Sequence, residues 1–401
     1  MPDILYITYD GLSDSLGQSQ VLAYLKRLSG KGNKIIIISF EKKHVDFKIK
    51  KEIQEIVSQS GLIWYPLDYT KTPPVLSTIY DIIRGYKLSK KLNRIYNFNI
   101  VHCRGYISAI IGRKLQRRFG TKFIFDMRGW WVDEKIESGF WNNPAYRIVY
   151  NYFKRKERDF FINSDYIVSL TYRGKDEIIK SGFSKEEKIG VIPTCVDFDI
   201  FRVCNPGIKS DMREKYAIEP NEKVFIYSGS VGGNYDHKKI IKVFKAFRAV
   251  FPNSFLLILS KDKVSDELEK QIIDEGINRL LIINAAFTEV SSFLCMGDAG
   301  FIFYKMNFSV IGRSPTKLGE YWASGLPVIA FKGIGDIDQI FNNYPHGGVL
   351  LSENEVEWPL EIKALESERG YSLRNYAKEY FSIENGVSFY NTIYKNLSVK
   401  N

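Results

Sequence analysis

The sequence of 401 residues lacks several features that mark particular classes of protein. It holds four cysteines, and no two of them stand in a Cys-x-x-Cys spacing. This excludes a dense disulfide framework and a cysteine-based zinc site, so we expect buried thiols in a reducing compartment. The four histidines show no metal-ligand spacing either, and we expect no metal site. The cysteines are Cys103, Cys195, Cys204 and Cys295.

Long apolar runs are also missing. No stretch reaches the roughly 18 apolar residues that a membrane-spanning helix requires. The first residues, MPDILYITYDG, hold an acid where a secretory signal would hold basic residues. No internal repeat and no low-complexity segment stands out. We therefore expect a cytoplasmic protein, and the length of the chain predicts two domains.

Acidic residues are scarce in one part of the chain. The whole chain carries a net charge of +11, with 57 lysines and arginines against 46 aspartates and glutamates. From Arg84 to Arg158 there are 18 basic and 5 acidic residues, a net charge of +13, so the remainder sums to −2. Charge this localised indicates an anionic partner: nucleic acid, an anionic lipid surface or a phosphorylated substrate. A solvated basic face is the plain alternative.

One segment of this basic region alternates aromatic and basic residues. The sequence WNNPAYRIVYNYFKRKERDFF, residues 141–161, is expected to form a helix. Such a helix could bind an anionic membrane surface, or it could bury its aromatic side and expose its basic side to water. The regional charge favours the membrane surface.

Short apolar runs alternate with helical patterns along the whole chain, which predicts parallel sheets with crossover helices. The expected strands are DILYITY, KIIIISF, FNIVHC, KFIFDM and DYIVSL in the first half, and KVFIYSG, SFLLILS, LLIINAAF, AGFIFY and LPVIAF in the second. The expected fold class is therefore α/β, with two doubly wound parallel-sheet (Rossmann-like) domains facing a cleft. Ligands of such sheets bind beyond the carboxyl ends of the strands.

The expected seam between the domains is the segment GVIPTCVDFDIFRVCNPG, which holds two prolines and precedes a polar helix. We assign a first domain to residues 1–195, a linker to 196–207 and a second domain to 208–378. A C-terminal helix over residues 379–401 can cross back to the first domain.

A helix of the second half has an unusual start in SPTKLGEYWASGLPVIA, residues 314–330. Ser314 is a good N-cap, and Pro315 suits the first helical position. A glycine and then a proline follow Ser324, and they end the helix. A helix is therefore expected from about Pro315 to Ser324.

Polar side chains gather on one face of this helix. Thr316, Lys317 and Glu320 share that face, and Leu318 and Trp322 are expected to face the core. A helix N-terminus carries free N–H groups and a partial positive charge, so with Lys317 it can seat an anion. The Glu320 carboxylate, one turn deeper, can accept two vicinal hydroxyls. Phosphate beside a diol describes a nucleotide, and a well-capped surface helix is the plain alternative.

This segment resembles the carboxy-terminal donor motif of glycosyltransferase family 4, the retaining enzymes of the GT-B fold. In that motif SPTK precedes xxEYxAxGxPVIA. Other stretches resemble the family in the same order: DGLSDSLGQSQVLAYLKRL (10–28), KIGVIPTCVDFDIF (188–201) and FIYSGSVGGNYD (225–236). The resemblance spans nearly the whole chain. It implies the GT-B architecture, with acceptor binding in the first domain and a UDP- or GDP-sugar donor in the second.

The resemblance also implies site residues. The residues expected to be catalytic are Lys317, Glu320, Arg128 and Asp126. Those expected to bind the donor are Gly229, Ser230, Gly232, Lys238, Arg313, Ser314, Thr316, Lys317 and Glu320, with Lys239 as the alternative to Lys238. Those on the acceptor side are Gly11, Gly17 and Gln18, in the first loop that resembles the family. His102, Arg104 and Trp130 are added because they follow expected strands of the first domain and would line the cleft, with a charged surface loop as the plain alternative. Lys317 and the helix start would stabilise the departing diphosphate, which itself helps to deprotonate the acceptor, so that no cofactor and no metal ion is required.

The chain departs from the family pattern at three positions. Eight positions before Glu320, where relatives hold a glutamate that contacts the donor sugar, stands Gly312. Arg128 takes the place of a histidine that follows a central strand in many relatives. Ser230 replaces the arginine of the glycine-rich turn. The missing glutamate bears on which sugar is bound.

Two further patterns have competing interpretations. FDMRGWWVDEK, residues 125–135, places two tryptophans directly after an apolar strand. They could stack on a sugar ring, insert at a lipid interface or, for one of them, pack in the core. Asp336 and Asp338 match the Asp-x-Asp of metal-dependent glycosyltransferases, but they precede a helix, where acids serve as N-caps, and we expect a structural role.

We therefore expect a retaining, metal-independent hexosyltransferase that moves a sugar from a nucleotide-diphosphate donor to a hydroxyl acceptor. The expected acceptor is a lipid-linked glycan of a bacterial surface polysaccharide such as lipopolysaccharide, and the expected location is the inner face of the cell membrane, as a peripheral protein. The alternatives are a nucleotide-sugar epimerase of similar fold, a catalytically inactive subunit and a nucleic-acid-binding protein. No nucleic-acid-binding module is recognisable, so nucleic acid is not an expected partner.

Overall fold

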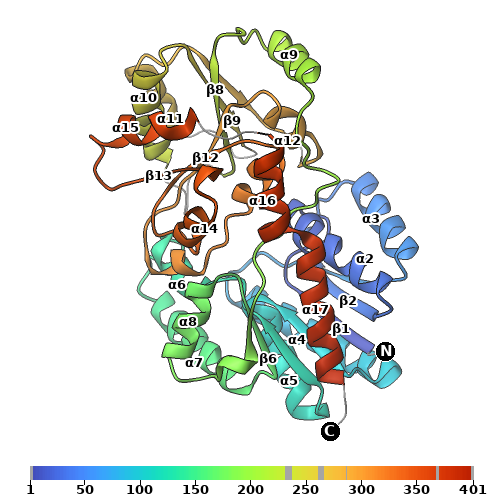
Figure 1. Ribbon diagram of the computed structural model, residues 1–401. Helices are drawn as coiled ribbons and strands as arrows, with labels where there is room; N and C mark the ends of the chain where they lie inside the picture. The colour runs from blue at the N-terminus through green and yellow to red at the C-terminus, as the bar shows by residue number, and fades with distance from the viewer. Residues whose placement is uncertain (1–2, 231–236, 261–265, 286, 367–369, 399–401) are drawn as a thin grey trace. The chain divides into compact units, whose positions relative to one another are not determined.

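The structure is a computed structural model that describes residues 3–230, 237–260, 266–285, 287–366 and 370–398 (Figure 1). The chain divides into two compact units, each built on one parallel sheet. The first unit holds the chain up to Ile136, Trp141–Cys195 and the segment from Ile383 onward. The second holds Glu137–Phe140 and Val196–Ser382. The α/β class with two parallel sheets is thereby confirmed.

The first sheet has seven parallel strands in the order β3-β2-β1-β4-β5-β6-β7. Its central strands read as continuous apolar runs because helices cover both faces of a parallel sheet. In β2, for example, the four isoleucines 35–38 are fully buried. The strands are β1 (Asp3–Thr8), β2 (Lys34–Glu41), β3 (Ile63–Asp68), β4 (Ile100–Arg104), β5 (Lys122–Asp126), β6 (Tyr166–Ser169) and β7 (Ile189–Val191).

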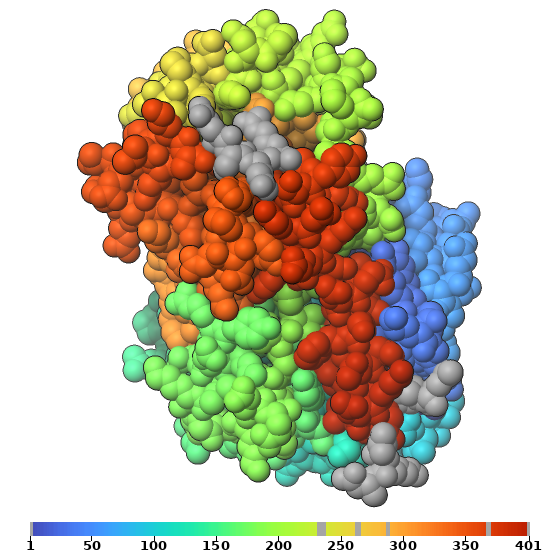
Figure 2. Space-filling model, viewed as in Figure 1, coloured from blue at the N-terminus to red at the C-terminus, as the bar shows by residue number. Residues whose placement is uncertain are grey.

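Helices connect these strands, and the last helix of the chain belongs to the same unit. Helix α17 packs against α2 and β4, and Figure 2 shows it in red beside the dark blue surface of α2. Helices α4 and α7 both pack against α5. The helices are α1 (Ser15–Gly17), α2 (Ala23–Gly30), α3 (Phe47–Gln59), α4 (Leu76–Tyr96), α5 (Gly105–Phe119), α6 (Trp131–Glu137), α7 (Tyr146–Asn163), α8 (Tyr172–Lys180) and α17 (Ile383–Ser398), with a π-helical turn at Gln18–Leu22.

The second sheet has six parallel strands in the order β10-β9-β8-β11-β12-β13. Its strands are β8 (Lys223–Ser228), β9 (Ser254–Leu259), β10 (Leu280–Ile283), β11 (Ala299–Ile302), β12 (Val328–Phe331) and β13 (Gly348–Leu351). Its helices are α9 (Pro206–Lys215), α10 (His237–Val250), α11 (Asp266–Asp274), α12 (Phe287–Leu294), α13 (Thr316–Ala323), α14 (Ile337–Asn343), α15 (Trp358–Lys363) and α16 (Tyr371–Phe381). Among the described residues, no helix combines the length and the hydropathy that crossing a membrane requires.

All ten expected strands are present, and three further strands were not expected. These are β3, β7 and β13, each at an edge of its sheet. Strand β3 holds a proline and half-exposed side chains, while β7 has only three residues and β13 only four. An edge strand is covered on fewer sides, so its sequence needs no long apolar run.

Two of the four cysteines differ from expectation. Cys204 and Cys295 form a disulfide, with their Cα atoms 5.2 Å apart. The pairing is invisible in the sequence because 91 positions separate the two residues, which the fold brings together before α9 and directly after α12. Cys103 and Cys195 are buried free thiols, as expected.

Candidate active site

The helix that carries the nucleotide-like pattern is α13. Its N-cap is Pro315, in an extended conformation, and not Ser314, so the helix starts one residue later than expected. Gly325 has the expected left-handed conformation, with φ of +78°. Leu318 and Trp322 are fully buried, also as expected. The Leu318 N–H donates to the Pro315 carbonyl at 3.0 Å, and the Thr316 and Lys317 N–H groups lie ahead of it at the helix start, which is the general position for anion binding.

Lys317 and Glu320 lie together on this helix. The Lys317 Nζ atom is 2.7 Å from Glu320 Oε2, and the glutamate side chain is only 4% exposed against 27% for the lysine. A carboxylate is expensive to bury unless it is paired, so Lys317 compensates the charge of Glu320 here. The pair gives the helix start one cation that can reach solvent and one anion held behind it.

Large aromatic side chains fix α13 against the sheet. The Tyr321 hydroxyl accepts a hydrogen bond from the Ser228 N–H at 2.9 Å, at the carboxyl end of β8. The Trp322 indole donates to the Gly347 carbonyl at 2.7 Å. Glycines allow this approach, since a Cβ atom at Gly300 would lie 2.4 Å from the Tyr321 ring. The helix start is therefore held at the carboxyl edge of the second sheet, where ligands of parallel sheets bind.

The other expected donor residues are distributed around this edge. Gly229 and Ser230 directly follow β8, and Tyr227 donates from its hydroxyl to the Ser230 carbonyl. Arg313, just before α13, lies 5.0 Å from the ring of Tyr304, which follows β11. Ser314 and Thr316 are half-buried at the helix start. Gly232 lies outside the described residues.

Lys238 has a different environment from the one expected. It is 54% exposed and forms an ion pair with Glu267 of α11 at 2.6 Å. Its neighbour Lys239 lies 4.3 Å from the ring of Phe331, the last residue of β12. Lys239 is thus the lysine of this pair at the carboxyl edge of the sheet, and a helix turns each residue by about 100° from the one before it, so the two lysines point apart.

The Asp-x-Asp pattern has structural partners. Asp338 Oδ2 accepts a hydrogen bond from the Gly333 N–H at 2.7 Å, and Asp336 is buried at the start of α14. Among the residues that the structure describes, no three His, Cys, Asp or Glu side chains gather as a possible metal site.

In the first unit, charged residues meet where the strand order reverses. Strand β1 has β2 on one side and β4 on the other, which makes the β1/β4 boundary the switch point of the sheet. Arg104, the last residue of β4, places its Nε atom 3.2 Å from Asp10 Oδ2, just past β1. Asp126, the last residue of β5, lies 3.7 Å from Arg128 Nη1.

Arg128 is held in a strained turn. Its φ angle is +55°, a left-handed conformation that is unusual for a residue with a side chain, and Gly129 follows at +96°. Such conformations persist only where the surroundings determine them, and they cluster at functional sites. The turn directs the guanidinium back toward Asp126 and leaves the side chain 12% exposed.

A buried network stands behind Asp126. The Tyr390 hydroxyl donates to Asp126 Oδ2 at 3.0 Å, His102 Nε2 lies 3.5 Å from the same oxygen, and His102 Nδ1 lies 2.7 Å from the Tyr394 hydroxyl. Burial alone would raise the pKa of the Asp126 carboxyl, but the charges of Arg128, His102 and Arg104 lower that pKa to about 2. Burial lowers the pKa of His102 below its usual 6.5, against the pull of Asp126. Asp126 is therefore an anion at neutral pH and a weak proton acceptor.

Several expected acceptor-side residues are buried. His102 is 1% exposed, because β4 is a central strand covered by α17. Trp130 is also buried and packs edge-on against Phe161, so the interpretation as a core tryptophan applies to it. Neither side chain presents a surface to an acceptor in this structure. Trp131 remains half-exposed.

The glycine-bearing loop after β1 is closed around a residue that the sequence did not reveal. The Leu12 and Ser13 N–H groups donate to the two oxygens of Glu41 at 2.7 and 3.0 Å. Gly17 has no room for a side chain, since a Cβ atom there would lie 1.9 Å from the Gly11 carbonyl oxygen. The buried Glu41 carboxylate thus takes the place that a bound anion would have on these N–H groups. The sequence feature that could have indicated this role is the position of Glu41, an acid at the end of the otherwise apolar strand β2.

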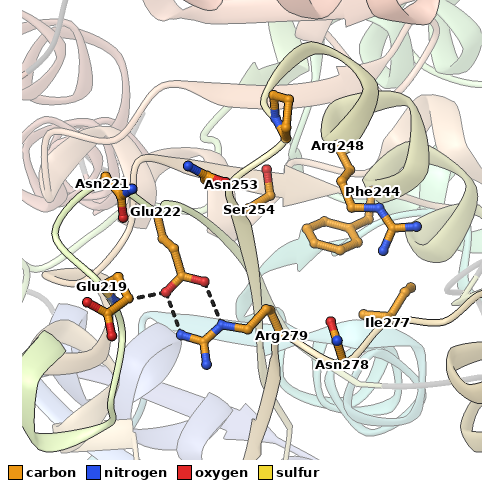
Figure 3. A pocket seen from close by; sticks show the side chains of 11 residues that line it. Glu219, Asn221, Glu222, Phe244, Arg248, Asn253, Ser254, Ile277, Asn278 and Arg279 are labelled. Atoms are coloured by element: carbon orange, nitrogen blue, oxygen red, sulfur yellow. Dashed lines mark hydrogen bonds and ion pairs between the residues drawn. The ribbon is translucent and has the colours of Figure 1, made fainter.

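A cavity of about 350 Å³ lies elsewhere in the second unit (Figure 3). Most of its lining residues stand just before β8, β9 and β10, and the others lie in α10 or begin β9, so it opens at the amino edge of the sheet, away from α13. Two of its charged groups pair with each other: Arg279 Nη2 lies 2.5 Å from Glu222 Oε2. Dashed lines mark this pair in Figure 3. Glu222 and Arg279 therefore neutralise each other and leave neither charge available to a ligand. The cavity does not belong to the site at α13.

Comparison with known proteins decides the family. Residues 17–200 match Glycosyltransferase Family 4, and residues 208–381 match Glycosyl transferases group 1. The chain belongs to the GT-B glycosyltransferases. The resemblance read from the donor motif is thereby confirmed, and α13 falls within the second match while Asp126 and Arg128 fall within the first.

Solved glycosyltransferases share this GT-B fold over their whole length. A glycosyltransferase from Rickettsia africae has a TM-score of 0.72 at 18% identity, over 100% of this chain and 99% of its own. HepE from Anabaena, in complex with UDP and glucose, has a TM-score of 0.70 at 11% identity, over 100% of both chains. WaaG, a glycosyltransferase involved in lipopolysaccharide biosynthesis, has 0.66 at 13%, over 96% of this chain and 99% of its own. No curated protein matches the sequence.

Proposed function

We propose that this GT-B glycosyltransferase transfers a hexosyl group from a nucleotide-diphosphate sugar to a hydroxyl acceptor, with retention of configuration and without a metal ion. The observation that carries the proposal is the Lys317–Glu320 pair at the start of α13, with the carboxylate almost fully buried and the ammonium reaching solvent. A cation at a helix start suits a diphosphate, and an anion one turn deeper suits the two ribose hydroxyls.

The proposed mechanism starts from the Lys317–Glu320 ion pair. When the donor binds, the Lys317 ammonium moves to the diphosphate and leaves Glu320 to accept hydrogen bonds from the ribose. The bond between the sugar carbon C1 and the diphosphate oxygen then breaks, with the electron pair leaving on the diphosphate. The acceptor hydroxyl oxygen forms the new bond to C1 on the same face, and its proton passes to the departing phosphate oxygen. Lys317 and the N–H groups of the helix start stabilise the charge that develops.

The donor nucleotide is UDP or GDP in this proposal. HepE holds UDP and glucose in one structure and UDP-glucose in another, which supports a UDP-sugar. For the acceptor we propose a lipid-linked glycan of a bacterial surface polysaccharide. The involvement of WaaG in lipopolysaccharide biosynthesis supports this setting.

We also place the protein at the inner face of the cell membrane, as a peripheral cytoplasmic protein. The support is the net charge of +13 between Arg84 and Arg158, which complements anionic lipid. Arg128 and Asp126 are proposed to act at the reacting centre, on the strength of the strained turn that holds Arg128.

Donor binding and turnover test this proposal. UDP-, GDP- and ADP-sugars are titrated by calorimetry, and transfer is followed by nucleotide release with and without EDTA. Lys317→Ala and Glu320→Gln should each reduce turnover at least about tenfold, equivalent to about 1.4 kcal/mol. Lys245→Ala, at an ion-paired surface lysine of α10, is the matched control and should leave turnover unchanged.

Full activity in both site variants, or abolition by EDTA with recovery on Mg²⁺, contradicts the proposal. Release of free sugar without acceptor would point to an epimerase instead.

A further inference from the structure

Helix α4 has its apolar side on the outside. Four apolar residues at helical spacing point away from the unit: Leu76, Ile79, Tyr80 and Ile83, with exposures of 64, 48, 54 and 44%. The buried side carries mainly small and polar residues: Ser77, Asp81, Gly85, Ser89 and Asn93, together with Ile82 and Leu92. An amphipathic helix of a globular protein normally has the reverse arrangement.

The inward face is complete without help from the outward one. Asp81 accepts hydrogen bonds from the Tyr9 hydroxyl at 3.0 Å and from the Thr70 N–H and hydroxyl, both at 2.9 Å. Gly85 allows close approach, since a Cβ atom there would lie 2.7 Å from Ile111 of α5. Packing of α4 on its own unit therefore does not require the apolar residues on its outer side.

The flanking charge selects one kind of partner. Helices α4 and α5 together carry nine lysines and arginines and a single acid, and that acid is the buried Asp81. On α4 itself the apolar turns come first, and Lys87, Lys91 and Arg94 are exposed in the turns that follow. A second copy of this chain would oppose these charges with its own, which is unfavourable. An anionic lipid surface can contact both halves of the helix, because its acyl region accepts the apolar turns and its headgroups attract the basic turns.

The aromatic and basic helix α7 is less suited to this role. Lys154 is bound between Asp133 and Glu157, at 3.0 and 2.5 Å, and belongs to the packing of α7 on its own unit. The exposed apolar residues of α7 are Ile148 and Tyr152, one turn apart near its start, and Ile162 near its end, so they form no continuous stripe along the helix. The structure thus shifts the expected membrane contact from residues 141–161 to α4.

We propose that the outward face of α4 docks on an anionic lipid bilayer, with Leu76, Ile79 and Ile83 entering the lipid interface and the following basic turns contacting headgroups. The proposal rests on the membrane attachment proposed above and goes further, since it names the helix and makes apolar insertion part of the binding. Because α5 packs between α4 and α7, the exposed Arg117, Arg118 and Arg155 then lie in the same helical layer and add to the headgroup contact.

Vesicle binding of full-length variants tests the proposal. The probes are phosphatidylcholine vesicles with and without phosphatidylglycerol, at low and high salt. The wild type should bind the anionic vesicles and retain part of this binding at high salt, because apolar insertion is not screened. Leu76→Ser/Ile79→Ser/Ile83→Ser should lower the partition coefficient at least about tenfold at both salt concentrations. Lys87→Gln/Lys91→Gln/Arg94→Gln should lower it on the order of a hundredfold at low salt only.

Ile148→Ser/Ile162→Ser on α7 is the matched control and should bind like the wild type. All substituted side chains are exposed, so the variants should keep the wild-type melting temperature and donor affinity. An α4 apolar variant that binds like the wild type, or an equal loss in the α7 variant, overturns the assignment to α4 while membrane attachment stands. A wild type that ignores anionic vesicles overturns both, and donor titration still reports separately on glycosyl transfer. A dimer in sedimentation velocity that the α4 variant abolishes would replace the bilayer by a second copy.

Discussion

Individual glycines let α13 approach the second sheet. A Cβ atom at Gly300 would lie 2.4 Å from the ring of Tyr321, and one at Gly347 would lie 2.1 Å from the ring of Trp322. Both rings are fully buried, so they have no free space into which to turn. The position of the Lys317–Glu320 pair thus depends on glycines, which have no side chain that could take part in binding or catalysis.

We expect Gly300→Ala to lower the free energy of unfolding by about 2 kcal/mol and to weaken donor binding, because the Tyr321 ring and with it α13 must move. Gly30→Ala is the matched control. Nothing lies within 4 Å of a Cβ atom there, so it should be neutral or stabilise α2 by up to about 1 kcal/mol. Urea denaturation and donor titration measure both effects. Equal stability of the Gly300 variant and the wild type would contradict the packing seen at Tyr321.

Acid should weaken the first unit through two residues. The pKa of Asp126 is lowered to about 2, so its contribution to stability is present above its usual pKa of 3.8 and is lost as the pH falls toward 2. The pKa of His102 is also lowered, so the folded state favours the neutral ring and loses stability as the pH falls below 6.5. Thermal unfolding against pH measures this, and His102→Gln should remove the upper part of the loss and Asp126→Asn the lower part. An unchanged profile in both variants would mean that other groups cause the acid loss.

At the scale of elements, the sequence predicts what local signals determine. The apolar run KIIIISF predicts β2 because every residue of it after Lys34 is buried, and capping signals place α13 within one residue. Contacts between segments far apart in the chain could not be predicted from the sequence. That Glu41 would fill the loop at Leu12 depends on how β1 and β2 lie side by side, and the environments of Lys238 and Lys239 depend on the rotation of α10. The burial of Trp130 follows from a turn whose direction no spacing encodes.

The disulfide should stabilise the second unit. Cys204 and Cys295 join the segment before α9 to the end of α12 across 91 positions, and a bridge that closes such a loop contributes typically 2–4 kcal/mol. Cys204→Ser/Cys295→Ser should therefore lower the melting temperature of the second unit. Dithiothreitol should do the same to the wild type and have no effect on the double variant. Insensitivity of the wild type to reductant would show that the bridge adds nothing to stability.

At the scale of the whole molecule, the end of the chain completes the unit that its beginning starts. Helix α17 buries Val387, Tyr390 and Tyr394 in the same core cluster as Tyr24 of α2. It also joins that unit by polar contacts, since Asn33 donates to the side chain of Asn391 at 2.9 Å. The core of the first unit is therefore complete only when α17 has been added, whereas the core of the second unit is drawn from Val196 to Phe381.

This division predicts that a change in α17 will destabilise the first unit alone. Val387 is fully buried, so Val387→Asp places a charge in that core and should lower the free energy of unfolding of the first unit by several kcal/mol. Thr392→Asp puts the same charge on the exposed side of the helix and is the matched control, with an expected effect within about 0.5 kcal/mol. Calorimetry should show the transition of the first unit moving to lower temperature, while donor binding and the transition of the second unit stay as in the wild type. A parallel fall of both transitions would mean that the two units unfold as one, and the assignment of α17 to the first unit alone would then be wrong.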